Sequence, residues 1–200
     1  MSVTIYVEGG GKDNHDTRAR CKEGFAEYCK KLAPLNRCPR IVVCGGRNDA
    51  FHRFEIAIGA SRDGDHCALL VDSEGPVQPG KDPAEFLHDC QGWHFPPRQH
   101  HRVFFMVQAM EAWLLADRDT LADYYGPGFR ANALRGDEHR VETIPKDDLE
   151  PSLTQATRDT QKGGYHKTRH AYDLLAKIDP QKVESASLRA KDFHDFLRSL

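Results

Sequence analysis

The sequence predicts an α/β fold, with a mostly parallel four-stranded sheet flanked by helices and a C-terminal helical extension. Short runs of β-branched and aromatic residues alternate with amphipathic stretches over residues 1–125, as in sheets built from parallel strands and crossover helices. One run, residues 66–75, is largely apolar, which is typical of a strand buried on both faces. We therefore expect an α/β core over residues 1–125. Residues 126–200 should form an irregular excursion and C-terminal helices packed on that core, because their apolar residues recur at helical spacing.

Each element has a local signal. The predicted strands, several of which stop at glycines, span residues 3–7, 40–46, 66–75 and 102–107. Predicted helices span residues 19–32, 47–60, 108–125 and two stretches of the tail. Asn48 or Asp49 is the expected N-cap of the second helix. Asp82 and Pro83 begin a short helix between the third and fourth strands, with aspartate as the cap and proline in the first position.

The composition is that of a globular protein, with 39% hydrophobic and 29% charged residues. No apolar run approaches the ~20 residues that cross a bilayer, and the N-terminus lacks the layout of a signal peptide. Six cysteines form no CxxC pair, so we expect buried free thiols in a reducing cytoplasm rather than a zinc site or disulfides. The net charge of −2 excludes a generally basic nucleic-acid coat and leaves a local basic patch open.

The stretch YVEGGGKD, residues 6–13, raises the question of phosphate binding. A Walker A loop requires a hydroxyl after its lysine, where this chain has Asp13. The dinucleotide pattern G-x-G-x-x-G fails as well, because its third glycine position is Asn14. The glycines let the backbone pass close to a ligand while Glu8 points into the same space. The alternative is a simple glycine turn with a solvated Glu8.

A metal site is the favoured hypothesis because acids also follow the third strand. Asp72 and Glu74 lie at its C-terminal edge, where parallel sheets bind ligands. Strand residues two apart point to the same side, and Glu8 joins them if the first and third strands are neighbours. A divalent cation would relieve the repulsion among these carboxylates, and oxygen ligands favour Mg²⁺ or Mn²⁺. The alternative is that one acid caps a turn and the other is solvated.

These motifs resemble the Toprim catalytic core of topoisomerases, bacterial primases and OLD-type nucleases. Glu-Gly follows the first strand and an acidic pair follows the third. The resemblance implies that Glu8 is a general acid/base and that Asp72 and Glu74 bind metal. Two features depart from the pattern: Glu74 replaces the usual second aspartate, and the loop from Glu8 to Asp13 is one residue longer.

Over nearly its full length, the chain resembles an uncharacterised bacterial Toprim-like family of unknown function. The segments that carry this resemblance are YVEGGGKD, CGGRNDAF, LLVDSEGP, VQAMEAWLLAD and KGGYHKTRHAYDLL. Members of that family are often encoded beside an ATPase of the AAA or ABC type. The resemblance therefore implies an ATPase partner and a role in bacterial defence.

Two further groups are expected near the same edge of the sheet. Gln108 and Glu111 lie three apart and would share a helix face. Glu111 is then a fourth metal ligand or a neighbour of the ligands, or simply a favourable acid in a first helical turn. Arg47 follows the second strand, where it would clamp a phosphate or remain an exposed loop arginine.

The segment RDTQKGGYHKTRHAYDLL is a candidate nucleic-acid contact. Glycines at a helix start expose backbone N–H groups, and Lys162, Lys167 and Arg169 add positive charge. Tyr165 would stack on a base or belong to the core. The alternative for the whole segment is a solvated helix face.

Two functions follow as expectations. The first is a metal-dependent nuclease acting on DNA or RNA, in which Asp72 and Glu74 hold Mg²⁺ or Mn²⁺ and Glu8 handles a proton or a second metal. The second is a non-catalytic, Toprim-shaped subunit that binds an ATPase through its helical tail. A homo-oligomer is compatible with either function.

Overall fold

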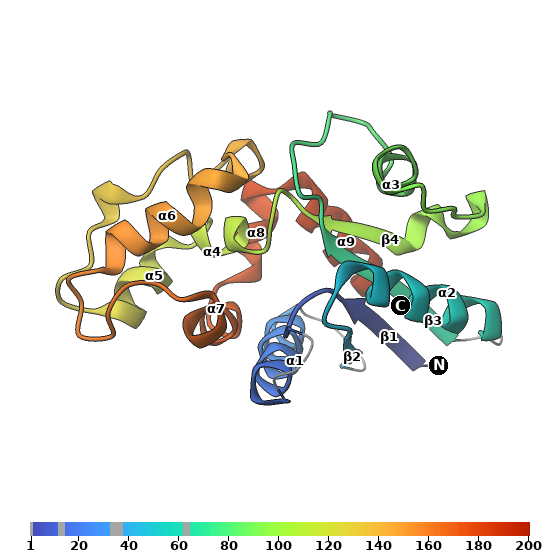
Figure 1. Cartoon of the computed structure of the whole chain (residues 1–200), viewed down its shortest axis with the longest axis horizontal. Coiled ribbons are helices and arrows are strands. Elements are labelled where there is room, and N and C mark those ends of the chain that lie inside the picture. Colours follow the sequence, from blue (N-terminus) through green and yellow to red (C-terminus); the bar gives the residue numbers. More distant parts are fainter. Residues whose placement is uncertain (1, 12–14, 33–37, 62–64) are drawn as a thin grey trace.

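The computed structural model describes residues 2–11, 15–32, 38–61 and 65–200. Within these ranges the chain forms a four-stranded sheet whose strands are all parallel, in the order β2-β1-β3-β4 (Figure 1). The strands are β1 (Ser2–Val7), β2 (Arg40–Val43), β3 (Asp65–Asp72) and β4 (Val103–Met106). The predicted α/β class is confirmed, and β1 and β3 are neighbours, as the metal hypothesis requires.

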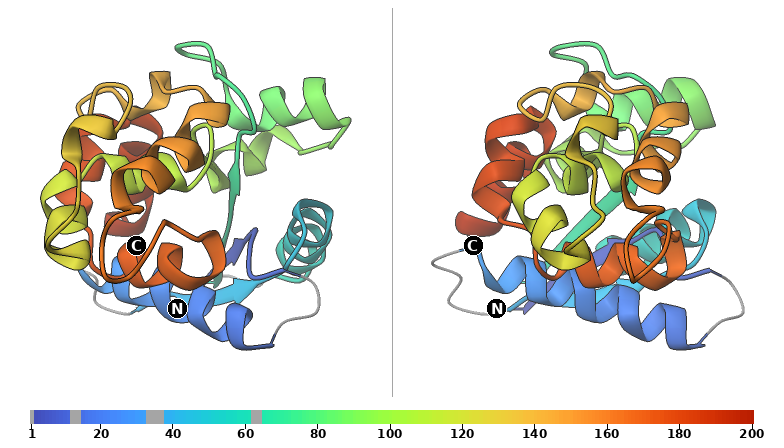
Figure 2. Two further views of the ribbon diagram at one scale, coloured as in Figure 1. Left: turned by 60° about the vertical axis from the view of Figure 1, so that its left-hand side comes forward. Right: turned by 90° about the vertical axis from the view of Figure 1, so that its left-hand side faces the viewer.

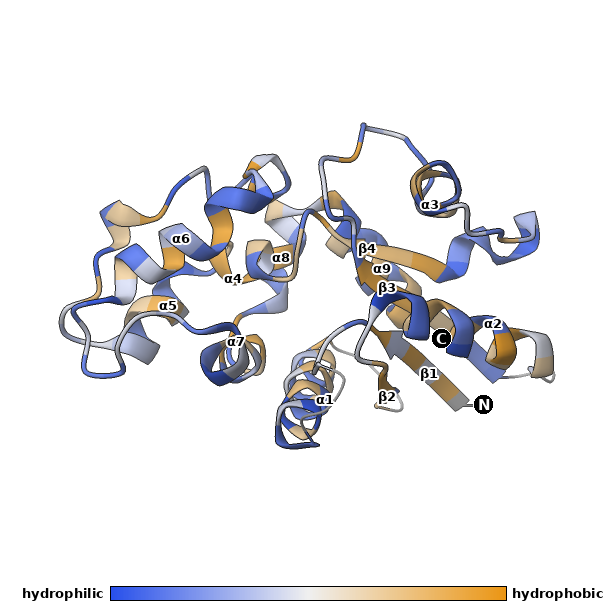
Figure 3. Ribbon diagram, in the orientation of Figure 1, coloured by the Kyte–Doolittle hydropathy of each residue, from blue (hydrophilic) through white to orange (hydrophobic). Residues whose placement is uncertain are grey.

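Alternating side chains of the strands divide the core between the two faces of the sheet. Leu70 packs on the side covered by α1 (His15–Lys30) and α9 (Leu188–Arg198). Leu69 and Val71 pack on the other side, under α2 (Arg47–Ala60) and α3 (Pro83–Gln91). Figure 3 shows that β4 is apolar along its length, as expected for a strand covered on both faces.

The remaining helices gather beyond the C-terminal edge of the sheet. They are α4 (Glu111–Leu115), α5 (Arg118–Tyr125), α6 (Lys146–Thr157), α7 (Lys167–Leu175) and α8 (Pro180–Ala186). Short 3-10 helices span Pro97–Arg102, Ala131–Ala133 and Val141–Thr143. Trp113 lies fully buried at the junction and stacks on Tyr28 of α1. The irregular excursion, which the sequence predicts over residues 126–150, is therefore too long, since α6 already begins at Lys146.

Helix α7 lies beside α1, although their residues are far apart in the sequence (Figure 2). The contact depends on a glycine, because a Cβ added at Gly24 would lie 2.6 Å from the carbonyl oxygen of Tyr172. This close approach brings the first residues of α7 to the edge of the sheet where β1 and β3 end.

Some local predictions hold and others are wrong. Asp82 caps α3 by accepting hydrogen bonds from the backbone N–H groups of residues 84 and 85. The N-cap of α2 is Gly46, not Asn48 or Asp49, because the helix already begins at Arg47. All six cysteines are free, with four buried and Cys38 and Cys90 exposed. Over the described ranges, no helix combines the length and apolar character of a membrane span.

Candidate functional site

Carboxylates from three elements meet at the C-terminal edge of the sheet. Glu8 directly follows β1, Asp72 is the last residue of β3, and Glu111 begins α4 after β4. The strand order places the ends of β1 and β3 side by side. This is the position at which parallel α/β sheets bind ligands.

Asp72 is the most deeply placed of the three acids. Its side chain is buried, and Oδ1 accepts a hydrogen bond of 2.9 Å from the backbone N–H of Met110. Burial raises the pKa of Asp72 well above its usual value, and the charges of Glu111 and Glu8 raise it further, whereas Lys167 opposes them. The charged form of Asp72 is therefore disfavoured at this buried position, and a cation nearby would relieve that cost.

Glu8 lies against an arginine. Its Oε2 is 3.6 Å from Nε of Arg47, and both atoms are buried without a hydrogen-bond partner in the described part of the chain. Burial raises the pKa of Glu8, Arg47 counteracts this, and Glu74 adds to it. Arg47 also donates to the backbone carbonyl of Asp72, so it connects the ends of β1 and β3.

Glu111 is held by the segment that precedes and starts α7. Its side chain is only 2% exposed; the Tyr165 hydroxyl donates to Oε1 at 3.1 Å, and Nζ of Lys167 lies 3.3 Å from the same oxygen. Burial works to lower the pKa of Lys167, but the carboxylates of Glu111 and Asp72 outweigh it and raise that pKa. Tyr165 is itself buried in the core, so the hypothesis that it stacks on a base is wrong.

Glu74 reaches the site by a different route from the one the sequence predicts. Strand β3 ends at Asp72, and Glu74 adopts a left-handed φ of 67°, so the alternation argument does not extend to it. Its carboxylate pairs with Lys146 at the start of α6. Gln108 does not share a helix face with Glu111, because α4 begins only at Glu111; the Gln108 Oε1 instead accepts the Lys146 N–H.

The glycine loop is tied to α7. The Gly10 N–H donates to the Tyr172 hydroxyl at 2.9 Å, and a Cβ at Gly9 would lie 3.2 Å from the same oxygen. The glycines thus allow a close approach of the backbone to Tyr172, whereas the predicted close approach to a ligand stays a prediction. Lys12, Asp13 and Asn14 lie outside the described residues.

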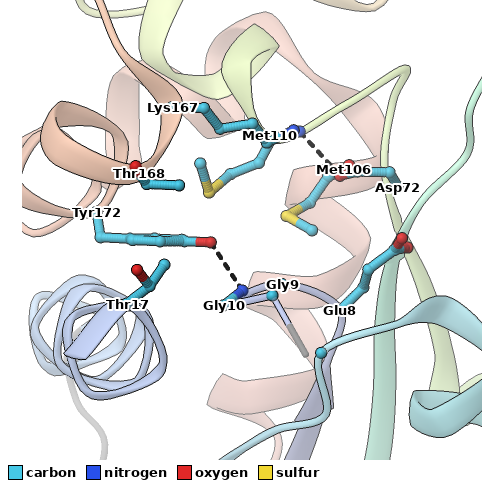
Figure 4. Close-up of a pocket in the computed structure, with 12 residues that line it drawn as sticks. Glu8, Gly9, Gly10, Thr17, Asp72, Met106, Met110, Lys167, Thr168 and Tyr172 are labelled. Atoms are coloured by element: carbon cyan, nitrogen blue, oxygen red, sulfur yellow. Dashed lines mark hydrogen bonds between the residues drawn. The ribbon is translucent and has the colours of Figure 1, made fainter. Parts of the chain in front are cut away.

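A cavity of about 300 Å³ opens between these elements (Figure 4). Its lining residues are Glu8, Gly9, Gly10, Gly11, Thr17, Gly45, Asp72, Met106, Met110, Lys167, Thr168 and Tyr172. Figure 4 shows Glu8 and Asp72 on one side and Thr168 and Tyr172 on the other. Two predicted acids therefore share the wall of one cavity with a predicted cation, Lys167.

The predicted basic residues separate into two groups. Arg47 and Lys167 contact the carboxylates described above. The Lys162 ammonium instead lies over the ring of Tyr124, 5.0 Å from its centroid. Arg169 is exposed on α7 and does not line the cavity.

The fit of a metal ion depends on how these charges are balanced. In the part of the chain that the structure describes, no group of three or more His, Cys, Asp or Glu side chains is arranged to hold a metal. Arg47 and Lys167 are close to Glu8 and Glu111 and already neutralise part of their charge. The donors still suit a hard cation, because they are carboxylate oxygens and Glu8 Oε2 is buried without a hydrogen bond. Glu8 and Asp72 thus supply oxygen donors of the kind that Mg²⁺ and Mn²⁺ prefer, and their role as metal ligands stays a prediction.

Sequence reasoning missed Lys146, Tyr172 and the Met110 N–H. Tyr172 follows Lys167 by five positions on α7, which is not the three- or four-residue spacing that places two side chains on one helix face, so no local pattern marks it. Nothing local marks Lys146, since its role depends on how α6 docks against the turn after β3.

The comparisons with known proteins place the chain in a family without giving it an activity. No curated protein and no solved structure matches the chain. A family model does match, over residues 8–198, which is nearly the whole length and includes Glu8, Asp72 and Glu111. The chain belongs to the family described as a domain of unknown function, DUF4276.

Proposed function

We propose that this protein is a nuclease that uses Mg²⁺ or Mn²⁺ to hydrolyse phosphodiester bonds in DNA or RNA. The observation that carries the proposal is the pairing of Glu8 and Asp72 on one cavity wall, at the ends of adjacent parallel strands. Arg47 and Lys167 contribute positive charge beside them. Carboxylates for a cation and cations for a phosphate are the components that phosphoryl transfer requires.

Each residue has a role that follows from its contacts. Glu8 and Asp72 would hold the ion, which when bound polarises a phosphate oxygen. The Met110 N–H fixes one oxygen of Asp72 and so orients the other. Arg47 reaches both Glu8 and the end of β3, from where its guanidinium can bind a phosphate. Burial raises the pKa of Glu8 above its usual value, which is the direction that favours a carboxyl acting as a general acid or base.

The resemblance to Toprim proteins supports the same assignment and adds a setting. It implies a bacterial defence system in which the chain works with an ATPase of the AAA or ABC type. In this proposal, Glu74 adds to the negative electrostatic potential at the site, since its charge raises the pKa of both Glu8 and Asp72.

Titration of Mn²⁺ by calorimetry tests the proposal without a guessed substrate. Asp72→Asn keeps an oxygen for the Met110 N–H and removes the charge, so it should fold and lose at least about tenfold in Mn²⁺ affinity. Asp123→Asn, at an exposed position on α5, is the matched control and should bind like the wild type. Equal affinity in all three proteins would refute the assignment of Asp72. A positive result justifies a screen of DNA and RNA substrates, with Glu8→Gln as the inactive variant.

A second function, that of a non-catalytic subunit of an ATPase complex, is favoured by one observation. The buried carboxylates already have basic neighbours, and the described residues form no ready metal-binding group. A folded wild-type protein that binds no Mn²⁺ and co-purifies with an ATPase would support this function over the first.

A further inference from the structure

The cavity beside Glu8 and Asp72 has a second end with different chemistry. Met106, Met110 and Tyr172 line it, and the sulphur atoms of the two methionines lie between Tyr172 and Asp72 (Figure 4). Most of this wall is carbon and sulphur, in contrast to the charged end. A ligand that fills the whole cavity therefore needs one anionic part and one apolar part.

The apolar end suits a flat, polarisable ring. Methionine sulphur makes favourable contacts with aromatic rings and adapts to their shape. Gly9, Gly10 and Gly11 form the neighbouring wall. The space beside Gly11 is open, because a Cβ there would meet nothing within 4 Å, and it lets a planar group approach the backbone closely. Thr168 stands at the rim with its methyl group toward the cavity, while its hydroxyl lies 3.1 Å from Nδ1 of His166.

Size limits the ligand further. A volume of about 300 Å³ is at the lower end of pockets that bind small organic molecules. The cavity accommodates one ring system next to a phosphate and excludes a stacked base pair. A base inside a duplex cannot reach it without leaving the stack.

We propose that the apolar end takes up one unstacked nucleobase, so that the substrate is an unpaired nucleotide, either free or within a single strand. This inference rests on the proposed function, because the phosphate at the carboxylate end carries its base into the adjoining space. It goes further by assigning Met106, Met110 and Tyr172 as the surface that binds the base.

The test compares ligands that a phosphodiesterase cannot cleave. Ribo- and deoxyribonucleoside 5′-monophosphates are titrated by calorimetry against ribose 5-phosphate and inorganic phosphate, with and without Mn²⁺. If the base binds as proposed, nucleotides bind roughly 5- to 150-fold more tightly than ribose 5-phosphate, the range expected for stacking of one base. Competition with single-stranded and duplex oligonucleotides then separates free nucleotides, unpaired strands and duplexes as the source of the base.

A pair of variants locates the binding. Thr168→Trp fills the cavity from an exposed position on its rim and should abolish the preference for nucleotides. Lys177→Trp places the same side chain at an exposed position beyond the end of α7 and should keep the preference. Mn²⁺ binding should persist in both variants.

The outcomes separate the two proposals. Equal affinity for nucleotides and ribose 5-phosphate, with Mn²⁺ bound normally, would overturn the base pocket and leave the metal site standing. A nucleotide preference that Thr168→Trp removes, in a protein that binds no Mn²⁺, would support the pocket and contradict the metal-dependent nuclease. A preference for duplex over single strands would also overturn the inference.

Discussion

Replacing Lys167 with methionine tests whether this lysine acts as the internal counter-ion of the candidate site. Its Nζ lies 3.3 Å from Oε1 of Glu111, whose side chain is 2% exposed, while the lysine side chain is 48% exposed. Coulomb's law at an effective dielectric constant of about 20 gives a gross attraction of about 5 kcal/mol at this distance. Exposure of the lysine reduces the net value, so we expect the substitution to lower the free energy of unfolding by about 1–2 kcal/mol.

The same substitution should strengthen metal binding. The lysine charge opposes a divalent cation at Asp72, because Lys167 already lowers the pKa of that residue. Removing it should tighten Mn²⁺ binding by about tenfold, or about 1.4 kcal/mol. The expected signature of Lys167→Met is therefore a protein that is less stable without metal and gains more stability from it than the wild type does.

Calorimetry and thermal unfolding with and without Mn²⁺ measure both effects. At a metal concentration one hundred times the dissociation constant, binding to the native state adds about 2.7 kcal/mol of stability, which is enough to offset the expected loss. Lys177→Met, at an exposed position outside the cavity, is the control and should change neither quantity. Weaker Mn²⁺ binding by Lys167→Met than by the wild type would refute the reasoning, because it would mean that the lysine favours metal binding instead of opposing it.

Two predictions concern the scaffold. Burial lowers the pKa of His194 in the native state to about 4, whereas in the unfolded state this pKa is near 6.5. At a pH between these two values, the unfolded state binds a proton that the native state does not. Because of this residue, the free energy of unfolding should fall by about 2 kcal/mol between pH 7 and pH 5. Urea unfolding of His194→Gln should show a smaller fall over the same pH range. A variant with the pH dependence of the wild type would contradict the assignment. Gly24→Ala should lower the free energy of unfolding by about 1–3 kcal/mol, because the new Cβ would meet the Tyr172 carbonyl at 2.6 Å. Gly59→Ala in α2, where a Cβ meets nothing within 4 Å, should instead raise the free energy of unfolding by about 0.5–1 kcal/mol. If the two alanine variants change stability to urea in the same way, the packing argument is wrong.

The sequence predicts the parts of the site that depend on strand ends and fails where helix docking decides. Glu8 and Asp72 follow from local signals, because the C-terminal ends of parallel strands lie at one edge and the order places β1 beside β3. The alternation argument for Glu74 fails, since period-two alternation holds only within a strand and β3 ends two residues earlier; the charge of Glu74 still acts on Glu8 and Asp72, and its role as a metal ligand stays a prediction. The contacts of Lys146 and Tyr172 join segments distant in the sequence, and no local pattern encodes which helices pack together.

The balance of buried charge supports the proposal that this edge of the sheet is a functional site. Burying carboxylates costs free energy that nearby cations seldom fully return, and apolar residues of similar volume often stabilise a fold as well or better. Here Asp72 and Glu111 are both buried, the charge of Glu111 helps to raise the pKa of Asp72, and Asp72 lines a cavity instead of lying inside the close-packed core. Stability alone does not account for that arrangement. The proposed cation site would account for it, because a bound cation would relieve the repulsion among the acids and so turn that repulsion into binding free energy.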